Sequence, residues 1–388
     1  MRPPSVRTQR LVNHLFRRIS TSGQPRVAVL YQALDPPIIN GVQKPKKPGG
    51  YRDSGADIAY VLREQGGISV ATPTLNPDPA KDADWVFPDH EQGILAAVQA
   101  GATCLWANTI LFANHPLQTS PALAPYLDRL HVVGQPPRFV DAYDDKNYVN
   151  SALRRHGTAA FTLPRSSIVS AAEDLAATLQ RDGITAWPVV AKPIRGRGSH
   201  GVKLCADLAQ LREHATRLFA ESPSFMVEQF LAGQEATVTV MPPSPGNPDG
   251  GYWAMPAVVR FNHVDGIAPY NGAVAVTANS RAVGEEEAAS DPAFGRLAME
   301  CEGVARLLGV RAPIRVDARR VRDGEGFALF DVNMKPNMTG PGRPGREDQA
   351  SLTALAAAGL GWDYARLLKE ILGSACTLGE LRSAKPAF

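Results

Sequence analysis

The chain has 388 residues, of which 44% are hydrophobic and 20% charged, and this composition excludes an intrinsically disordered or fibrous protein. The formal net charge is +3, from 41 basic and 38 acidic residues, so the overall charge gives no reason to expect a nucleic-acid partner. No run of apolar residues is long enough for a membrane-spanning helix, and we therefore expect a soluble protein with no membrane partner. At roughly 150 residues per domain, the length predicts two or three domains.

Residues 1–26 form a basic segment, with six arginines ahead of Asp35, the first acidic residue. Serine and threonine accompany these arginines, and such a composition is typical of a mitochondrial presequence. A solvated basic arm ahead of the first strand has the same composition. We therefore expect a cytoplasmic protein, with a mitochondrial location as the alternative. The four cysteines are widely spaced without a CxxC pair, which indicates buried thiols in a reducing compartment and no zinc site.

The first organised part of the chain alternates apolar strands with amphipathic helices. Val27 opens a short apolar strand, and Asp53 or Ser54 is expected to cap the helix that follows a Lys/Pro/Gly-rich loop. A strand, a helix and a further strand are expected over residues 68–71, 94–98 and 102–107. This alternation predicts an α/β domain over residues 27–140.

The remainder is predicted to form two more units, over residues 141–231 and 232–388. The elements expected in the middle unit are a helix, an extended segment, a second helix and an apolar strand, around residues 152–153, 161–163, 171–179 and 189–191. A proline- and glycine-rich stretch over residues 242–251 is typical of a surface loop between two strands of the third unit. The sequence contains no internal repeat.

The first chemical signal is a glycine-rich run, Gly196-Arg-Gly198-Ser199-His200-Gly201, which follows an apolar strand ending near Lys192. A dinucleotide-binding turn would lead directly into a helix, whereas these glycines lead into Val-Lys-Leu-Cys, which indicates a second strand. Between two strands, glycine lets main-chain N–H groups approach a phosphate closely, and Lys192 supplies a fixed positive charge. The run therefore favours a flap over phosphates, with a glycine hairpin that binds no ligand as the alternative.

The second signal is an acidic, glycine-containing bend between two apolar strands, Glu228-Gln-Phe-Leu231-Ala-Gly-Gln-Glu235. One interpretation is a plain connection between two domains. In the other, the bend is a hinge that binds a purine nucleoside through one carboxylate and main-chain groups at the base and a second carboxylate at the ribose. The bend by itself does not separate these two interpretations.

The third and most specific signal lies on two neighbouring apolar strands, one around Asp317 and one ending at Asn333. Asp331 and Asn333 share one face of their strand because the strand period is two, and Asp317 on the partner strand can meet them there. Hard oxygen ligands in this arrangement suit Mg2+ held together with substrate phosphates. Arg315 points the same way as Asp317, where a guanidinium stabilises negative charge that develops on a reacting oxygen.

Taken in order, these segments resemble the ATP-grasp superfamily, and most closely its D-alanine–D-alanine ligase-like branch. The matching elements are an N-terminal α/β domain, a lysine at a helix start, a Lys-Pro-glycine hairpin, a Glu-x-x-Leu-x-Gly-x-Glu hinge, an Arg-x-Asp strand, and an acid-x-Asn strand followed by Pro-x-Met-Thr. The resemblance covers roughly residues 27–370. It implies an ATP-grasp fold of the α/β (α+β) class, in which an N-terminal Rossmann-like domain precedes two α+β subdomains that clasp ATP.

The resemblance also implies roles for individual residues. It assigns the contacts to the ATP phosphates to Lys146, Lys192, Gly198, Ser199, His200 and Gly201. It assigns the adenosine contacts to Glu228, Leu231 and Glu235, and the ligands of two Mg2+ ions, which Mn2+ could replace, to Asp317, Asp331 and Asn333. The candidate catalytic residues are Arg315, Ser199 and His200.

The reaction that the resemblance implies is an ADP-forming ligation. ATP phosphorylates a carboxylic acid, an amine then attacks the acyl phosphate, and the products are an amide, ADP and phosphate. The substrates are expected to be small molecules, amino acids among them, and the resemblance favours a homodimer. Two alternatives stay open: a small-molecule kinase on the same scaffold, and a non-catalytic ATP-binding regulatory protein.

This sequence departs from the ligase pattern in ways that bear on the substrate. Asp331 stands where glutamate is common, the flap carries Arg197 and His200 where the ligases tend to have an acid and a serine, and the run after Thr339 is rich in glycine and arginine instead of serine and histidine. Arg343 or Arg346 in that run either binds a substrate carboxylate or lies in solvent.

The candidate substrate residues are Asp53, Ser54, Asn337 and Arg343. Asn108 and His115 are further candidates for a pocket. The basic loop with Lys44, Lys46 and Lys47 either recognises an acidic substrate or only adds solubility.

Overall fold

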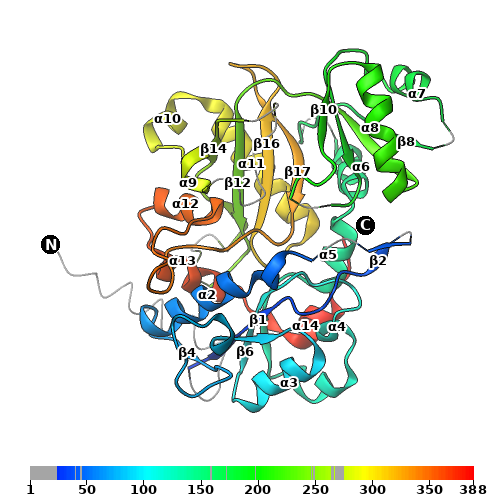
Figure 1. Ribbon diagram of the computed structural model, residues 1–388. Helices are drawn as coiled ribbons and strands as arrows, with labels where there is room; N and C mark the ends of the chain where they lie inside the picture. Colours follow the sequence, from blue (N-terminus) through cyan, green and yellow to red (C-terminus); the bar gives the residue numbers. More distant parts are fainter. Residues whose placement is uncertain are drawn as a thin grey trace.

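The computed structural model describes residues 24–388 except 40, 44, 45, 158, 159, 172, 197, 246, 248, 249, 264, 265 and 267–274. Most of the basic N-terminal segment, Lys44 of the basic loop and Arg197 of the glycine run therefore lie outside the described residues. The described chain forms three larger β-sheets, each with its own helices (Figure 1). None of the described helices is long and apolar enough to cross a bilayer.

The first sheet is parallel apart from one edge strand, and it follows the order β18-β7-β6-β1-β4, with β5 also paired to β1. Its strands are β1 (Arg26–Tyr31), β4 (Ser69–Val70), β5 (Val86–Pro88), β6 (Cys104–Asn108), β7 (His131–Val133) and β18 (Cys376–Thr377). In β1, alternate residues enter two different apolar clusters, so both faces of the strand are covered. A strand covered on both faces is apolar throughout, which explains the run Val-Ala-Val-Leu.

Helices and short helical turns surround this sheet, and a small hairpin precedes them. The hairpin strands are β2 (Ile38–Ile39) and β3 (Val42–Gln43), and the helical segments are η1 (Pro48–Tyr51), α2 (Arg52–Glu64), η2 (Asp82–Asp84), α3 (Glu91–Gln99), α4 (Pro116–Thr119), η3 (Pro121–Tyr126), α5 (Pro137–Tyr143), α13 (Tyr364–Leu372) and α14 (Leu378–Ser383). The expected strands and helices of this unit are confirmed, with small shifts at their ends.

The start of α2 differs from the expectation of a side-chain cap at Asp53 or Ser54. The helix begins at Arg52, directly after Tyr51, which has a φ of 63° and makes no side-chain cap hydrogen bond. The Ser54 hydroxyl instead donates to the Tyr51 carbonyl, 3.2 Å away. Gly49 and Gly50 also have positive φ, so three left-handed residues in a row turn the chain into the helix.

The second sheet is antiparallel, with the order β10-β9-β11-β8. Its strands are β8 (Ser166–Ser170), β9 (Val189–Pro193), β10 (Lys203–Cys205) and β11 (Ser224–Gln229), and its helices are α6 (Lys146–His156), α7 (Leu175–Arg181) and α8 (Leu208–Glu221). The expected extended segment at 161–163 is not a strand, and the strand lies at β8 instead. The helix expected from Ala171 begins only at Leu175, because the Asp174 side chain caps it by accepting from the Ala177 N–H.

The third sheet is also antiparallel, in the order β15-β14-β12-β16-β17, with β13 paired to β12. Its strands are β12 (Glu235–Met241), β13 (Trp253–Ala254), β14 (Val258–Arg260), β15 (Ser280–Ala282), β16 (Ile314–Arg320) and β17 (Phe327–Asn333), and its helices are α9 (Val276–Asn279), α10 (Glu285–Ser290), α11 (Pro292–Leu308) and α12 (Leu352–Gly359). The stretch over residues 242–251 connects two strands, as expected. Alanine, valine and isoleucine side chains on one face of β12 and β16 pack in the same cluster as α11, which leaves the face carrying Thr237, Arg315 and Asp317 for chemistry.

The end of the chain returns to the first sheet. β18 pairs antiparallel with β7, and in Figure 1 the red α14 lies among the blue and cyan elements of the first unit. The sequence predicts a third unit over residues 232–388, which would place this segment with the third sheet. The difference arises because the two-residue strand β18 is too short to carry a signal in the sequence.

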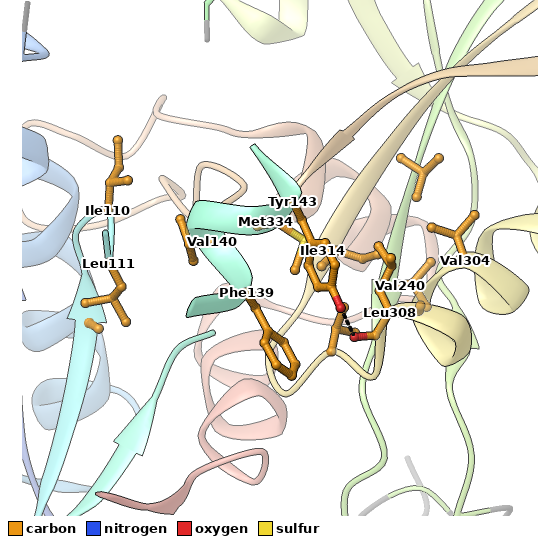
Figure 2. Close-up of a cluster of buried hydrophobic side chains, with 14 of the residues drawn as sticks. Ile110, Leu111, Phe139, Val140, Tyr143, Val240, Val304, Leu308, Ile314 and Met334 are labelled. Atoms are coloured by element: carbon orange, nitrogen blue, oxygen red, sulfur yellow. Dashed lines mark hydrogen bonds between the residues drawn. The ribbon is translucent and has the colours of Figure 1, made fainter. Parts of the chain in front are cut away.

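Apolar side chains connect the first and third sheets through α5. Figure 2 shows Phe139, Val140 and Tyr143 of α5 between the first unit and the side chains of Val240, Leu308 and Ile314. The Tyr143 hydroxyl donates to the Leu308 carbonyl at 3.1 Å (dashed in Figure 2). Since α5 leads into α6, this contact fixes where the second unit begins.

Candidate active site

The main cavity of the described chain lies between the second and third sheets and has about 1270 Å³ of space outside protein atoms, part of it open to solvent. It is lined by twelve of the residues expected at the site: Lys146, Lys192, Gly198, Ser199, His200, Glu228, Leu231, Glu235, Arg315, Asp317, Asp331 and Asn333. Gly201, Asp53, Ser54, Asn337 and Arg343 do not line it. Residues as far apart in the sequence as Lys146 and Asn333 thus meet in one cavity large enough for a small-molecule ligand.

The strand register of β16 and β17 brings the polar cluster together. Asp317 lies directly opposite Asp331, and Arg315 lies opposite Asn333. The Arg315 guanidinium donates two hydrogen bonds to the Asp317 carboxylate, from Nε to Oδ1 and from Nη2 to Oδ2, each 2.8 Å long. The arrangement expected from the strand period is therefore present in the structure.

Asp317 is held as a carboxylate by these contacts. Its burial works against ionisation, but the charge and hydrogen bonds of Arg315 and the hydrogen bond from the Thr237 hydroxyl (2.6 Å) outweigh burial, so its pKa lies below the ordinary value. An ionised carboxylate beside Asp331 and the Asn333 amide oxygen suits a divalent cation of the Mg2+ type. No three His, Cys, Asp or Glu side chains gather into a metal cage anywhere in the described residues.

Two lysines approach the same end of the cavity from different elements. Lys192, at the end of β9, is buried, and its Nζ lies 2.6 Å from a Glu228 carboxylate oxygen and 3.0 Å from the Phe330 carbonyl. Lys146, at the start of α6, donates to the Gly196 carbonyl at 2.9 Å and lies 3.5 Å from Asp331 Oδ1. The Lys146 ammonium therefore lies beside the acidic cluster, and the Lys192 ammonium lies at the main chain of the residue before Asp331, so both are placed where phosphates of a ligand could meet them.

The glycine run forms the turn between β9 and β10. Gly198 and Gly201 have φ values of 63° and 69°, and Ser199 adopts the same left-handed region at 59°. A Cβ on Gly201 would lie 2.9 Å from the Pro193 ring, so this glycine permits close packing of the turn on its own strand. The His200 ring is half exposed, with Nε2 3.0 Å from Glu221 at the end of α8, which ties the turn to that helix.

The hinge carboxylates are already paired. Glu228 contacts Lys192, and the Asn150 amide lies 3.4 Å from its other oxygen. Glu235 is buried between Arg260 (3.3 Å) and His263 (2.9 Å). Arg260 and Arg319 also line the cavity, and sequence reasoning missed both. Each of the two arginines stands at or next to the end of an apolar strand, and the sequence gives no other indication that they lie at the cavity.

The expected substrate residues lie elsewhere, around the start of α2. Asp53 pairs with Arg346 at 3.4 Å, and Arg343 is buried against Asp57, Nε to Oδ1 at 2.9 Å. Arg343 is buried and Arg346 is partly exposed, and both arginines pair with carboxylates of the protein itself. Asn337 accepts hydrogen bonds from the N–H and the hydroxyl of Thr339, so it shapes its own turn. His115 is buried 3.4 Å from Asp89.

A second, smaller cavity adjoins the main one at Met334, lies between the first sheet and the segment after Asn333, and has about 460 Å³ of space outside protein atoms. Asn108 lines it and is buried, and both amide protons are used, in bonds to the Tyr51 carbonyl and the Ser54 hydroxyl. Within the described part of the chain, Asn108 Oδ1 meets no hydrogen-bond donor. A buried acceptor of this kind is satisfied by a ligand or water that donates a hydrogen bond.

Comparison with solved structures identifies the fold. The described architecture matches a D-alanine–D-alanine ligase from Bacillus anthracis complexed with ATP, with a TM-score of 0.60 at 17% identity over 90% of this chain and 96% of that one. It also matches the D-Ala:D-Ser ligase VanG from Enterococcus faecalis, with a TM-score of 0.55 at 13% identity over 91% of this chain and 99% of that one. The protein has the ATP-grasp fold.

Comparison of sequences identifies the family. The family model described as the D-ala D-ala ligase C-terminus matches residues 160–373, and the chain belongs to this family. It is 26% identical over 187 residues to a D-alanine–D-alanine ligase from Aquifex aeolicus, and 29% identical over 224 residues to one from Stutzerimonas stutzeri. These matches cover 48% and 56% of this chain, and 56% and 61% of the two relatives, so the chain spans little more than half the length of the curated relatives it matches. The resemblance expected from the motifs is confirmed.

Proposed function

We propose that the protein is an ATP-dependent ligase that joins a carboxylic acid to an amine and releases ADP and phosphate. The observation that carries this proposal is the convergence, at one end of one cavity, of two lysines with Arg315, Asp317, Asp331 and Asn333. Positive charge close to an acidic cluster suits a triphosphate bound with a divalent cation. The family to which the chain belongs supports the same activity.

Different residues along the cavity would bind different parts of ATP and its cation. The bend from Glu228 to Leu231 would receive the adenine through main-chain groups, and Glu235 would accept hydrogen bonds from the ribose. Lys146, Lys192 and the turn at Gly198–Gly201 would hold the phosphates, and Asp317, Asp331 and Asn333 would hold the divalent cation. The cation neutralises charge on the phosphates, which lets an anionic carboxylate approach.

The chemistry proceeds in two transfers. A carboxylate oxygen of the acid attacks the γ-phosphorus, the bond to the ADP oxygen breaks, and an acyl phosphate forms. The amine nitrogen then attacks the acyl carbon, phosphate leaves, and the amine proton passes to solvent. Arg315 would stabilise the oxygen that becomes negative during the second attack, and its position in the wall of the cavity supports this role. Neither transfer needs a nucleophilic side chain of the protein.

The finer features of the proposal concern substrates, metal and assembly. The acid is a small molecule, an amino acid among the candidates, and the second cavity with the Asn108 acceptor supports a substrate that carries a hydrogen-bond donor. The site would take two Mg2+ ions, with Mn2+ as a substitute, and the protein would act as a homodimer.

The test is product analysis by 31P NMR. Purified protein with Mg2+-ATP is incubated with pooled amino acids and small carboxylic acids, with and without amines. We expect ADP and phosphate only when an acid and an amine are both present. Hydroxylamine as a general nucleophile should convert the activated acid to a hydroxamate.

Other products would reject the proposal in different ways. AMP and pyrophosphate would exclude an acyl phosphate. A stable phosphorylated product that forms without an amine would identify a kinase. ATP binding without turnover across all pools would identify a regulatory protein.

A further inference from the structure

The last two residues of the chain pack against the junction between α5 and α6. The Ala387 N–H donates to the Tyr143 hydroxyl oxygen at 2.9 Å. The Phe388 ring lies 6.1 Å from the Tyr143 ring and 5.3 Å from the Tyr148 ring, measured between centroids. The three rings form one aromatic cluster beside the end of the chain, which Figure 1 places next to α5 and α6. Tilted ring pairs at these separations are favourable.

This cluster lies directly behind the nucleotide cavity. Tyr143 is almost fully buried, lines that cavity, and donates to the Leu308 carbonyl (Figure 2). Tyr148 belongs to the first turn of α6, where its N–H is capped by Asp145 at 2.9 Å. Phe388 therefore packs on the helical turn that begins with Lys146.

The opposite side of the same turn is held by the strand that leads into the glycine run. The Lys146 N–H donates to the Ile194 carbonyl at 3.0 Å, and the Lys146 ammonium donates to the Gly196 carbonyl at 2.9 Å. Arg195 adds a bond to the Asp141 carbonyl at 2.7 Å. The start of α6 is thus held between the glycine run on the cavity side and the end of the chain on the outer side.

We propose that Ala387 and Phe388 are positioning residues that hold the first turn of α6, and with it the Lys146 ammonium, at the phosphate end of the cavity. The inference rests on the proposed function in one respect, that Lys146 binds a phosphate of ATP. Phe388 itself is 38% exposed and carries no polar side chain, so it acts through Lys146 and not on the nucleotide.

The test compares Phe388→Ala with the unmodified protein in direct binding of Mg2+-ATP by calorimetry. Loss of the ring contacts is expected to weaken ATP binding by about three- to tenfold. It should raise the KM for ATP by a similar factor while the KM for the acid stays unchanged. Amide hydrogen exchange should become faster at residues 147–150 and stay unchanged in β16 and β17.

Two further variants separate positioning from general stability. Phe388→Tyr keeps the ring and should restore ATP affinity to within about twofold. Leu360→Ala removes an apolar side chain with the same exposed fraction, 38%, at the end of α12, and should leave ATP affinity and α6 exchange unchanged.

Each outcome has one meaning. If the unmodified protein binds no ATP, the proposed function fails. If it binds ATP, and Phe388→Ala binds equally well with the same protection of α6, the proposal on the chain end is overturned. An equal loss of affinity in Leu360→Ala would also overturn it, because the effect would then be one of general destabilisation.

Discussion

Arg315 and Asp317 are two residues apart on β16, so one guanidinium meets one carboxylate through two parallel bonds of 2.8 Å. Such a planar pair fixes the direction in which the remaining N–H groups of Arg315 point. A lysine at position 315 would keep the positive charge but could not form the two parallel hydrogen bonds. We therefore expect the proposed reaction to depend on the geometry of the guanidinium and not on its charge alone.

We expect Arg315→Lys to lower kcat by about 100-fold or more, the range seen when one donor to a reacting oxygen is lost, with a smaller change in ATP affinity. Steady-state release of ADP in the presence of hydroxylamine measures this. Arg281→Lys is the matched control, because Arg281 makes a similar two-bond pair with Glu287 on the exposed surface. Equal losses in the two variants would contradict a role for Arg315 in catalysis.

Asp89 is a buried carboxylate at the end of β5 with several hydrogen bonds. Burial would raise its pKa, but the neighbouring His115 ring, 3.4 Å away, and hydrogen bonds from the Thr109 hydroxyl and the Leu34 N–H outweigh burial, and the pKa lies below the ordinary value. A carboxylate with a lowered folded pKa stabilises the protein above its unfolded pKa, about 3.9. That stabilisation is lost as the pH falls through the lower folded pKa.

Asp89→Asn should therefore lower the free energy of unfolding at pH 7 by about 2 kcal/mol and flatten its decline in acid. Urea titrations between pH 2.5 and 7 measure both effects. Asp128→Asn, an exposed carboxyl in the same unit, is expected to leave the curve unchanged. If the free energy of unfolding of Asp89→Asn were lower but declined in acid as steeply as that of the unmodified protein, the charge of Asp89 would not be the cause of the pH dependence.

Residue positions could be predicted from the sequence where the interaction is local to a strand or a hairpin. Asp317, Asp331 and Asn333 lie on one face because alternate residues of neighbouring strands do so. The partners of Glu235 could not be predicted in this way. Arg260 lies opposite Glu235 because β14 pairs with β12, and these two strands are separated in the sequence by a loop and β13, so their register could not be foreseen. Likewise, nothing near Arg343 in the sequence indicates its carboxylate partner Asp57, which lies 286 positions away.

At the scale of elements, the turn from β1 into α2 depends on two neighbouring glycines with different surroundings. Gly49 has a φ of 72°, and a Cβ added there would meet nothing within 4 Å, whereas Gly50 has a φ of 58° and would place its Cβ 2.0 Å from the Gln32 carbonyl oxygen. Gly50 also accepts a hydrogen bond from the Gln32 N–H at 2.8 Å. The two positions therefore separate backbone strain from steric overlap.

Gly49→Ala is expected to cost about 1–2 kcal/mol of unfolding free energy, the strain of one left-handed residue. Gly50→Ala adds an overlap with backbone and should cost clearly more, with loss of the hydrogen bond to Gln32. Urea denaturation measures both. Equal free energies of unfolding for the two variants would mean that the loop can move away from Gln32 without a loss of stability.

Element types were predictable where the apolar pattern is long, and element ends were not. β1, β9 and β11 carry buried runs that only a covered strand explains. The residue at which α2 begins could not be predicted from the sequence. Glycine permits a positive φ without requiring it, and a residue such as Tyr51 rarely adopts one. The short strand β18 has no pattern of its own and exists only because β7 offers it an edge.

At the scale of the whole molecule, the first and third units are locked by buried charges. Asp57 on α2 is fully buried and receives Arg343 at 2.9 Å and Arg346 at 2.8 Å, both from the loop that follows β17. Removal of one partner from a buried ion pair leaves an uncompensated charge. The loop between β17 and α12 is thereby fixed to the first unit.

Asp57→Ala should lower the free energy of unfolding by about 3 kcal/mol, at the low end of the range for buried pairs because Asp82 still pairs with Arg343. Glu213→Gln, which removes an exposed pair with Arg217 on α8, should cause no measurable change. Thermal and urea unfolding test this. Equal stability of Asp57→Ala and the unmodified protein would show that the units are held by apolar contacts alone.

The pairing of β18 with β7 has a consequence for synthesis on the ribosome. β7 is complete at Val133, yet its neighbour, Cys376–Thr377, is translated only after all the strands of the second and third sheets. Chains grow at about 5–20 residues per second, so β7 remains an unpaired edge strand of the nascent first sheet for many seconds. An open strand edge is a site for pairing with another chain. The nascent chain therefore depends on the emergence of Cys376–Thr377 to close the sheet that it began first.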